Sequence, residues 1–277
     1  MFEDNAPHTA LTPAQRFHFD VYGYVLLESI LPSDEVAAMK EALYRMRSDP
    51  NKAARGIYLN HEQDHSIHMG NLVAYDPSLT RFAAHPLLLP LVRDVVGGEV
   101  RLEETEAIIN RRDPKSDTDG LRERDIVPLG FHTGTRHGWG TYQEQDRFHC
   151  LFVKTLAYLT DVGPGDGGTA VIPGSHKMAW RQNEMIEAAF EDPKHLIRQV
   201  QGPAGSVLLF AESLIHSTTA VWSDRERVIC VAGYTPPMLR EWPGNEIDPA
   251  YLATLPEETR RVLSGSDSWN WRRNYPS

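Results

Sequence analysis

The sequence has few cysteines, no excess of basic residues and no long apolar run. Only two cysteines, Cys150 and Cys230, occur in 277 residues, which excludes a disulfide scaffold or a cysteine-rich zinc site. Both have apolar neighbours, which indicates buried free thiols and a reducing cytoplasm. The 28 Lys and Arg against 38 Asp and Glu give a net charge of −10. This acidic balance argues against a nucleic-acid partner, because a phosphate backbone requires a basic face.

Membrane insertion and secretion are not indicated either. The most apolar stretches, residues 86–92 and 207–210, are too short to cross a bilayer. Residues 1–5 are acidic and polar and do not resemble a secretory signal. A hydrophobic fraction of 41% and a charged fraction of 24% are instead typical of a globular protein. We therefore expect a cytoplasmic globular protein without a membrane partner.

The predicted secondary structure changes after Gly98, from mainly helices to short strands. Residues 1–98 predict mainly helices, with Thr12 as an N-cap and Gly97 as a stop signal. Residues 99–240 consist of short strand-like runs separated by Gly, Pro and Asp, which favours a sandwich or barrel. These runs are residues 100–109, 151–160, 169–172, 196–200, 206–210, 215–220 and 227–234. We predict one mainly β domain over 1–277, with helical support up to 98 and a C-terminal extension from 241.

Two of the twelve histidines stand in a context that favours metal binding. His132 lies in Gly-Phe-His-Thr-Gly as the chain enters the β region, and His216 begins a strand. Imidazoles on neighbouring strands of a barrel can converge on one metal. Iron(II) oxygenases use two histidines and one carboxylate on one face of the metal and leave the other positions open.

Arg227 follows His216 near the start of the last long strand. A guanidinium inside a barrel needs an anionic partner, and a dicarboxylate cosubstrate could supply one with two parallel hydrogen bonds. The alternative is an ion pair with an Asp or Glu of the chain. Thr218 lies two residues after His216, so it shares the same strand face and could donate to the same carboxylate.

The sequence resembles the phytanoyl-CoA dioxygenase family of Fe(II)/2-oxoglutarate oxygenases over about residues 12–234. The matching blocks are Phe19-Asp-Val-Tyr-Gly-Tyr-Val-Leu-Leu, Gly167-Gly-Thr-Ala-Val-Ile-Pro-Gly-Ser-His and Gly205-Ser-Val-Leu-Leu-Phe with the later His216 and Arg227. The resemblance implies a double-stranded β-helix, or jelly roll, and O2 as cosubstrate. It also implies iron ligands at His132 and His216, and 2-oxoglutarate contacts from Arg227, Thr218 and Asn110. His176, in the Pro-Gly-Ser-His turn, is interpreted as structural.

The chain departs from the family pattern at one position. The family has His-x-Asp, whereas this chain has His132-Thr133-Gly134 and so lacks the carboxylate ligand. Glycine leaves room for a small anion. The same change occurs in 2-oxoglutarate-dependent halogenases, which implies a chloride at Gly134 and capture of chloride by a substrate radical. We therefore expect Gly134 to be the halide site of a chlorinase.

Three alternatives remain open. Another carboxylate, with Glu144 or Asp146 the nearest in sequence, could replace the missing ligand and make the enzyme a hydroxylase. Two histidines with water in the vacant position could also hydroxylate. Finally, a jelly roll without a working metal site could be a binding module.

Substrate contacts are predicted from positions around these ligands. Glu106 shares a strand face with Asn110, and Arg136 and His137 could meet an anion, while the aromatic residues could stack on a ring. The candidates are Glu106, Phe131, Arg136, His137, Trp139 and Trp222. The polar segment 111–124 is expected to form a surface loop whose basic residues could close over a phosphate or carboxylate. These features predict a small, anionic, nucleotide-like partner, although packing and solvation would also explain them.

Overall fold

A computed structural model describes residues 10–122, 124–134, 140–144, 147–178, 181–240 and 247–265. Its helices are α1 (Pro13–Tyr22), α2 (Ser33–Ser48), α3 (Pro77–Ala83), α4 (Leu89–Val96), α5 (Gln182–Glu191), α6 (Pro193–Leu196), α7 (Pro249–Ala253) and α8 (Glu257–Ser264). Short 3-10 turns cover Ala53–Arg55 and Ser175–Lys177. No helix in these ranges has the length and apolar character needed to span a membrane.

Twelve strands in the described ranges form antiparallel sheets. They are β1 (Tyr24–Leu27), β2 (Tyr58–Gln63), β3 (Ser66–Gly70), β4 (Arg101–Asn110), β5 (Thr141–Glu144), β6 (Arg147–Cys150), β7 (Val153–Tyr158), β8 (Thr169–Val171), β9 (Arg198–Val200), β10 (Val207–Ala211), β11 (His216–Thr218) and β12 (Arg227–Thr235). The large sheet has the order β1-β10-β7-β12-β4-β3-β2, and a small sheet has the order β11-β8-β9. The predicted mainly β fold with helical support is confirmed.

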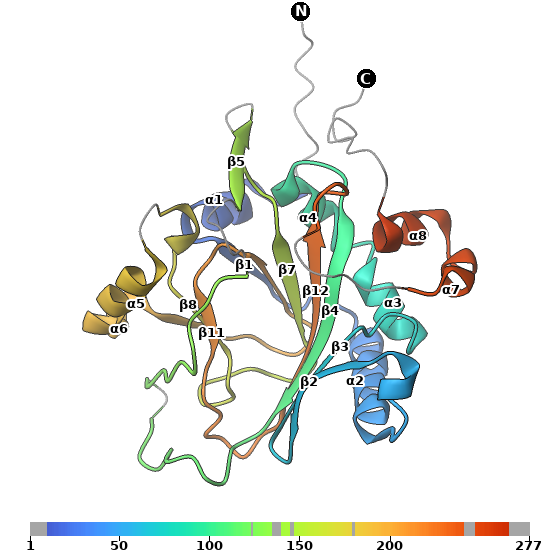
Figure 1. Ribbon diagram of the computed structural model, residues 1–277. Helices are drawn as coiled ribbons and strands as arrows, with labels where there is room; N and C mark the ends of the chain where they lie inside the picture. Colours follow the sequence, from blue (N-terminus) through green and yellow to red (C-terminus); the bar gives the residue numbers. More distant parts are fainter. Residues whose placement is uncertain are drawn as a thin grey trace, which may run out of the picture.

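The helices and the small sheet lie on opposite sides of the large sheet. Figure 1 shows α2, α3, α4 and α8 on one side, and β8 and β11 on the other. The large sheet therefore buries one face under helices and turns the other toward the small sheet. This second face is the one available for a site between the two sheets.

Local signals explain where the helices begin and end. The Thr12 side chain accepts a hydrogen bond from the backbone N–H of Gln15, and the Gln15 side chain accepts one from that of Thr12, which forms a capping box at α1. Gly97 adopts φ 88° at the end of α4, a left-handed conformation that glycine reaches without steric cost. Both positions behave as the sequence predicts.

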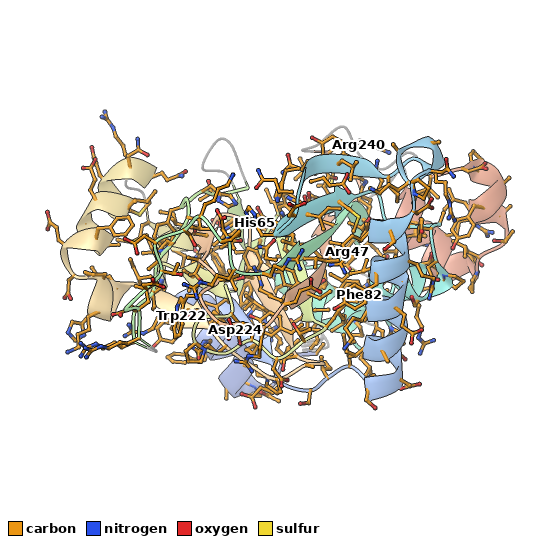
Figure 2. The ribbon with its side chains drawn as sticks, turned by 90° about the horizontal axis from the view of Figure 1, so that it is seen from below. Arg47, His65, Phe82, Trp222, Asp224 and Arg240 are labelled. Carbon is orange, nitrogen blue, oxygen red and sulfur yellow. The ribbon has the colours of Figure 1, made fainter. Side chains whose placement is uncertain are left out.

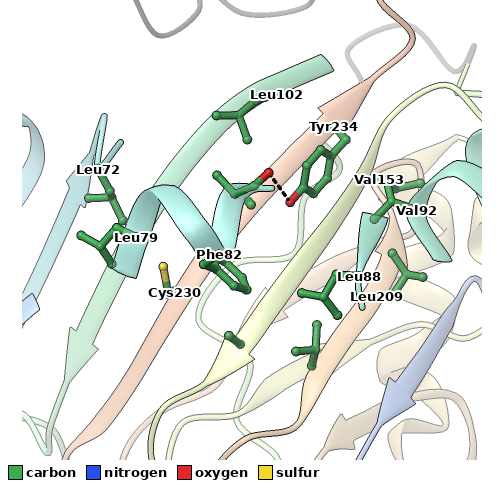
Figure 3. Packing of buried hydrophobic residues seen from close by; sticks show 14 of the residues in the cluster. Leu72, Leu79, Phe82, Leu88, Val92, Leu102, Val153, Leu209, Cys230 and Tyr234 are labelled. Carbon is green, nitrogen blue, oxygen red and sulfur yellow. Dashed lines mark hydrogen bonds between the residues drawn. The ribbon is translucent and has the colours of Figure 1, made fainter. Parts of the chain in front are cut away.

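The main apolar cluster lies between the helices and the large sheet. Figure 3 shows Phe82 and Leu88 of the helical layer beside Leu209 and Tyr234 of the sheet. The Tyr234 hydroxyl donates to the carbonyl oxygen of Ala83 over 3.2 Å, so β12 is tied to the end of α3. Each such side chain stabilises the fold by about 1.5–3 kcal/mol through burial alone. This packing holds the sheet rigidly under the site.

Cys150 and Cys230 are buried free thiols, as predicted. Burial raises the pKa of Cys150 to about 12, because the thiolate would lose its hydration. Neither thiol is therefore ionised at neutral pH, and both behave as small apolar groups of the core.

Some boundaries differ from the prediction. The helical region expected up to residue 98 also contains β2 and β3, which extend the large sheet beyond β4. Residues 111–122 contain no helix or strand, in agreement with the predicted loop, and Arg112 pairs there with Asp119 over 2.7 Å. In the C-terminal extension, α8 packs on β4 and buries Val262 and Leu263.

Candidate active site between the two sheets

His132 and His216 lie side by side. Their backbones form an antiparallel bridge with two hydrogen bonds of 2.9 Å, and their ring centroids are 4.4 Å apart. Nδ1 of His216 lies 2.8 Å from the carbonyl oxygen of Leu214, and Nδ1 of His132 lies 3.1 Å from that of Gly130. Each Nδ1 therefore carries the proton and donates to a carbonyl, which leaves Nε2 with a free lone pair for a metal.

Six of the predicted site residues line one cavity of about 560 Å³. Glu106 and Asn110 come from β4, His216 and Thr218 from β11, and Arg227 from β12. Asn110 and Arg227 are direct partners across the β4–β12 ladder, so their side chains leave the sheet on the same face. The six residues are Glu106, Asn110, His132, His216, Thr218 and Arg227.

Arg227 has the environment of an anion-binding residue. It is 1% exposed, and its Nε and Nη1 have no hydrogen-bond partner among the described residues. Burial lowers the pKa of Arg227 to about 10, which still leaves it cationic at neutral pH. The alternative ion pair is not found, since no Asp or Glu in the described ranges pairs with Arg227. A buried guanidinium without a counter-ion fits an incoming carboxylate.

The empty volume predicted beside Gly134 does not exist. A Cβ placed on Gly134 would lie 1.4 Å from Oε2 of Glu212 and 2.5 Å from its Cδ. The expectation of a halide-sized space at Gly134 is therefore wrong, because a carboxylate from the end of β10 fills it. Of the two carboxylates considered as replacements, the Glu144 side chain and all of Asp146 lie outside the described residues.

Glu212 is absent from the residues predicted for the site, although the sequence carries a signal for it. It is the one acidic residue in the otherwise apolar run 207–215, immediately ahead of His216. Lys154 is likewise the single charge in the strand-like run 151–160 before Asp161. A charge inside a buried strand needs a partner, so both residues mark the interior of a polar site.

A second cavity of about 640 Å³ adjoins the first and shares His132, Glu106 and Lys154 with it. Lys154 Nζ lies 2.8 Å from Glu104 Oε1, 3.5 Å from Glu212 Oε1 and 3.8 Å from Glu106 Oε2. Burial acts to lower the pKa of Lys154, but these three carboxylates raise it above its ordinary value. The lysine is therefore cationic and binds the acidic side chains together.

The two strand carboxylates of this cavity differ in pKa. Burial raises the pKa of Glu104 to about 7 despite the nearby charge of Lys154. Burial acts in the same direction on Glu106, but the hydrogen bond from His68, 3.1 Å away, and the charge of Lys154 bring its pKa down to about 2. Glu106 is thus ionised at neutral pH, while Glu104 gains or loses its proton close to neutral pH.

The β2–β3 hairpin, which the sequence did not predict, forms a wall of the first cavity. Ser66 donates to Oδ1 of Asn110 over 2.7 Å, which orients the Asn110 amide nitrogen away from that contact. His68 accepts from Asn60 at Nδ1 over 3.0 Å, so its Nε2–H faces Glu106. The signal in the sequence is alternation of His and small polar residues on both sides of residues 64–65, which is weak for a hairpin.

Two other predicted substrate residues, Phe131 and Trp222, do not line either cavity. Phe131 packs against Phe190, with ring centroids 5.8 Å apart, and lines neither cavity. Trp222 lies against Gly165, and Figure 2 shows it beside Asp224, apart from His65 of the hairpin. Both predictions are corrected, because loop packing accounts for these aromatic rings. Arg136, His137 and Trp139 lie outside the described residues.

His176 also lies away from the cavities. It is buried beneath Gly23, where a Cβ would approach its ring to 2.6 Å, and it packs edge-on against Phe148. These contacts agree with a structural role for the Pro-Gly-Ser-His turn.

The donor set of the first cavity fits iron and 2-oxoglutarate. Two imidazole Nε2 atoms are available, a buried guanidinium has unpaired N–H groups, and an unpaired carboxylate adjoins the histidines. In the part of the chain that the structure describes, no three His, Cys, Asp or Glu side chains already surround one metal position. His132 and His216 are therefore the pair that would first hold the metal, and a third side chain would have to reorient.

A two-sheet antiparallel fold that joins this histidine pair to a buried arginine defines an iron- and 2-oxoglutarate-dependent oxygenase. The phytanoyl-CoA dioxygenase (PhyH) family matches residues 19–229, and the chain belongs to this family. The resemblance predicted from the motifs is thereby confirmed.

Known relatives agree with this assignment. The ectoine dioxygenase of Stutzerimonas stutzeri (strain A1501) is 26% identical over 239 residues, which cover 78% of this chain and 72% of that protein. HygX from Streptomyces hygroscopicus, solved with nickel, 2-oxoglutarate and hygromycin B, is 25% identical with a TM-score of 0.66 over 84% of this chain and 90% of its own. EctD from S. alaskensis with bound Fe shares the fold at 21% identity and a TM-score of 0.65, over 95% and 90% of the two chains. The jelly-roll prediction is confirmed.

Proposed function

We propose that this protein is a hydroxylase of a small molecule rather than the predicted chlorinase. In this reaction one oxygen atom of O2 enters a substrate C–H bond as a hydroxyl group. The other oxygen atom is taken up by 2-oxoglutarate, which leaves as succinate and CO2. The observation that carries the choice is the Glu212 carboxylate, which occupies the space that the absence of a side chain at Gly134 was expected to leave for a chloride. The ectoine dioxygenases among the relatives support the same choice.

The cosubstrate would bind at the Arg227 end of the first cavity. Arg227 would donate to the distal carboxylate of 2-oxoglutarate, and Thr218 and the Asn110 amide line the same end. Such charge-assisted hydrogen bonds orient the cosubstrate toward the histidine pair. Iron held there supplies the redox chemistry that activates O2. The chain itself fixes the tautomers of His132 and His216 through their carbonyl partners.

The substrate end has acidic walls. Glu104, Glu106 and Glu212 face the second cavity, and Lys154 is the cation among them. This lining favours a substrate with ammonium or hydroxyl donors, in place of the anionic one predicted from Arg136 and His137. HygX was solved with hygromycin B bound, so ectoine and hygromycin B are reasonable first compounds to test.

The test combines Fe(II), 2-oxoglutarate and each compound in halide-free buffer and in sodium bromide, under air. We expect succinate to form and the product to gain one oxygen atom in both buffers, as measured by mass spectrometry. A brominated product would contradict the hydroxylase proposal and favour the halogenase function predicted from the sequence. If no succinate forms above the metal-free background, with either compound or without one, the result would favour the alternative of a non-catalytic binding module.

The metal assignment is tested with histidine variants. His132→Ala and His216→Ala should each lower the affinity for Fe(II) or Co(II) by at least about 10–100-fold, since each removes a ligand. His195→Ala, at an exposed position of α6, is the matched control and should bind as the parent protein does. Equilibrium dialysis under argon measures the affinity, and unchanged binding in His132→Ala would contradict the assignment.

A further inference from the structure

Gly134 and Glu212 are neighbours in the fold. The backbone N–H of Gly134 donates to the carbonyl oxygen of Glu212 over 3.0 Å, so the two residues face each other across a pair of chain segments. Oε2 of Glu212 lies where any side chain at position 134 would begin. An aspartate at 134 and the present position of Glu212 therefore exclude each other.

The Glu212 carboxylate is buried and has no hydrogen-bond partner among the described residues. The residue is 0% exposed, and neither Oε1 nor Oε2 accepts a hydrogen bond from the described residues. Its ion-pair partner is Lys154 at 3.5 Å, and that lysine is closer to Glu104, at 2.8 Å. A buried carboxylate without hydrogen bonds is costly unless a cation binds it.

A metal held by the histidine pair would lie near this carboxylate, since Glu212 and His132 line the same cavity. His132 stands two residues before Gly134, and His216 four residues after Glu212. Glu212 follows the last residue of β10, where its backbone N–H donates to the carbonyl oxygen of Phe152, so its backbone is anchored. The side chain itself makes no hydrogen bond with the described residues, so turning toward the two imidazoles would break none of these bonds.

We propose that Glu212 supplies the third, carboxylate ligand of the metal, and that Gly134 makes the room for it. The proposal rests on the metal site of the proposed function. The missing aspartate of His-x-Asp is thereby replaced from another strand, and the ligand set remains two neutral imidazoles and one carboxylate. This arrangement opposes halide binding, because a chloride beside Glu212 would bring two negative charges together in a buried space.

The experiment compares metal affinities of Glu212→Gln, Glu212→Ala and the double variant Gly134→Asp/Glu212→Ala, using Co(II) and 2-oxoglutarate under argon. Glu212→Gln and Glu212→Ala should bind Co(II) at least about 10-fold more weakly. The double variant returns a carboxylate to the family position and should recover most of the affinity. Asp94→Asn is the control, since it removes a buried carboxylate that pairs with Arg16 and Arg147 and lies outside both cavities.

Thermal melts of each apoprotein establish that the variants fold. If Glu212→Ala does not fold, Glu212→Gln, which is closest in shape to the parent residue, decides the result. Parental Co(II) affinity in Glu212→Gln would overturn the role of Glu212 while leaving the histidine site intact. Parental affinity in both Glu212→Gln and His132→Ala would instead overturn the proposed function.

A second readout does not depend on affinity. Crystals grown with Co(II), 2-oxoglutarate and bromide should show an anomalous bromine peak beside the metal in Glu212→Ala, and no such peak in the parent protein. A bromine peak in the parent protein, with Glu212 turned away from the metal, would overturn the proposal.

Discussion

At the scale of single residues, the site contains buried charges that lack hydrogen bonds within the described part of the chain. Two nitrogen atoms of Arg227 and both carboxylate oxygen atoms of Glu212 are buried there without a hydrogen-bond partner. Each group loses its hydration without gaining a full set of hydrogen bonds, which destabilises the ligand-free protein. A ligand that supplies the missing hydrogen bonds binds more tightly for this reason. This explains why two such costly residues stand in one small interior space.

Replacing Arg227 with methionine tests this view. We expect the dissociation constant for 2-oxoglutarate to rise by about 10–100-fold, because hydrogen bonds to charged groups contribute about 1.5–3 kcal/mol. The melting temperature of the apoprotein should stay the same or rise, since an unpaired buried charge is removed. Calorimetric titration with Mn(II) present measures the binding. Arg181→Ala, at an exposed position, is the control, and equal loss in that variant would contradict a specific role for Arg227.

At the scale of elements, the turn between α4 and β4 sets the position of the strand that carries Asn110 and Glu106. Gly97 ends α4 at φ 88° and lies close to the Tyr142 hydroxyl, which donates to the carbonyl oxygen of Val96 over 2.7 Å. A Cβ at residue 97 would come within 2.4 Å of Tyr142 Oη and 2.9 Å of His149 Nδ1. Both backbone conformation and space therefore require glycine at this turn.

Gly97→Ala and Gly56→Ala separate these two requirements. Gly56 has φ 84°, but a Cβ there would meet nothing within 4 Å. Gly56→Ala should lower the free energy of unfolding by about 1–2 kcal/mol from backbone strain alone. Gly97→Ala should lower it by about 1–3 kcal/mol more, because the neighbouring side chains must shift. Urea unfolding measures the free energy of unfolding of both variants. If both variants lost the same amount, the side chains around residue 97 would have to make room for the new methyl group at no energetic cost.

At the scale of the whole molecule, two buried histidines outside the site contribute to how the fold responds to acid. Burial lowers the pKa of His149 to about 4, and burial also lowers the pKa of His176 to about 4. Both are neutral in the folded protein, whereas in the unfolded chain they take up protons near the ordinary histidine pKa of about 6.5. Their contribution to stability is thus complete above about pH 6.5 and is lost as the pH falls toward about 4.

We expect urea unfolding to show this loss, with His149 alone accounting for on the order of 3 kcal/mol between about pH 6.5 and pH 4. Burial raises the pKa of Asp94, so protonation of that carboxyl works in the opposite direction and reduces the total loss. His149→Phe retains a ring next to Tyr142 and should flatten the acid side of the stability profile. An unchanged pH profile in this variant would assign the acid sensitivity to other groups.

The sequence by itself determined many of the elements and the six predicted residues that line the first cavity. The helix start after Thr12 and the helix end at Gly97 follow from capping signals, which act between residues close in the chain. The family resemblance implied that Asn110 and Arg227 contact one cosubstrate, and the structure makes them partners across the β4–β12 ladder. Such features are local or carried by a recurring pattern, so one sequence is enough to predict them.

Only the tertiary structure decided what fills the space beside Gly134, which is the observation behind the proposed hydroxylase. The sequence shows a missing aspartate but cannot show that Glu212 arrives from another strand, because that contact depends on how β10 and the segment at Gly134 meet. The β2–β3 hairpin was hidden for the same reason, since its strands are stabilised by pairing with β4 rather than by their own propensity. Contacts between segments distant in the chain carry no local signal, and they are the contacts that define the chemistry here.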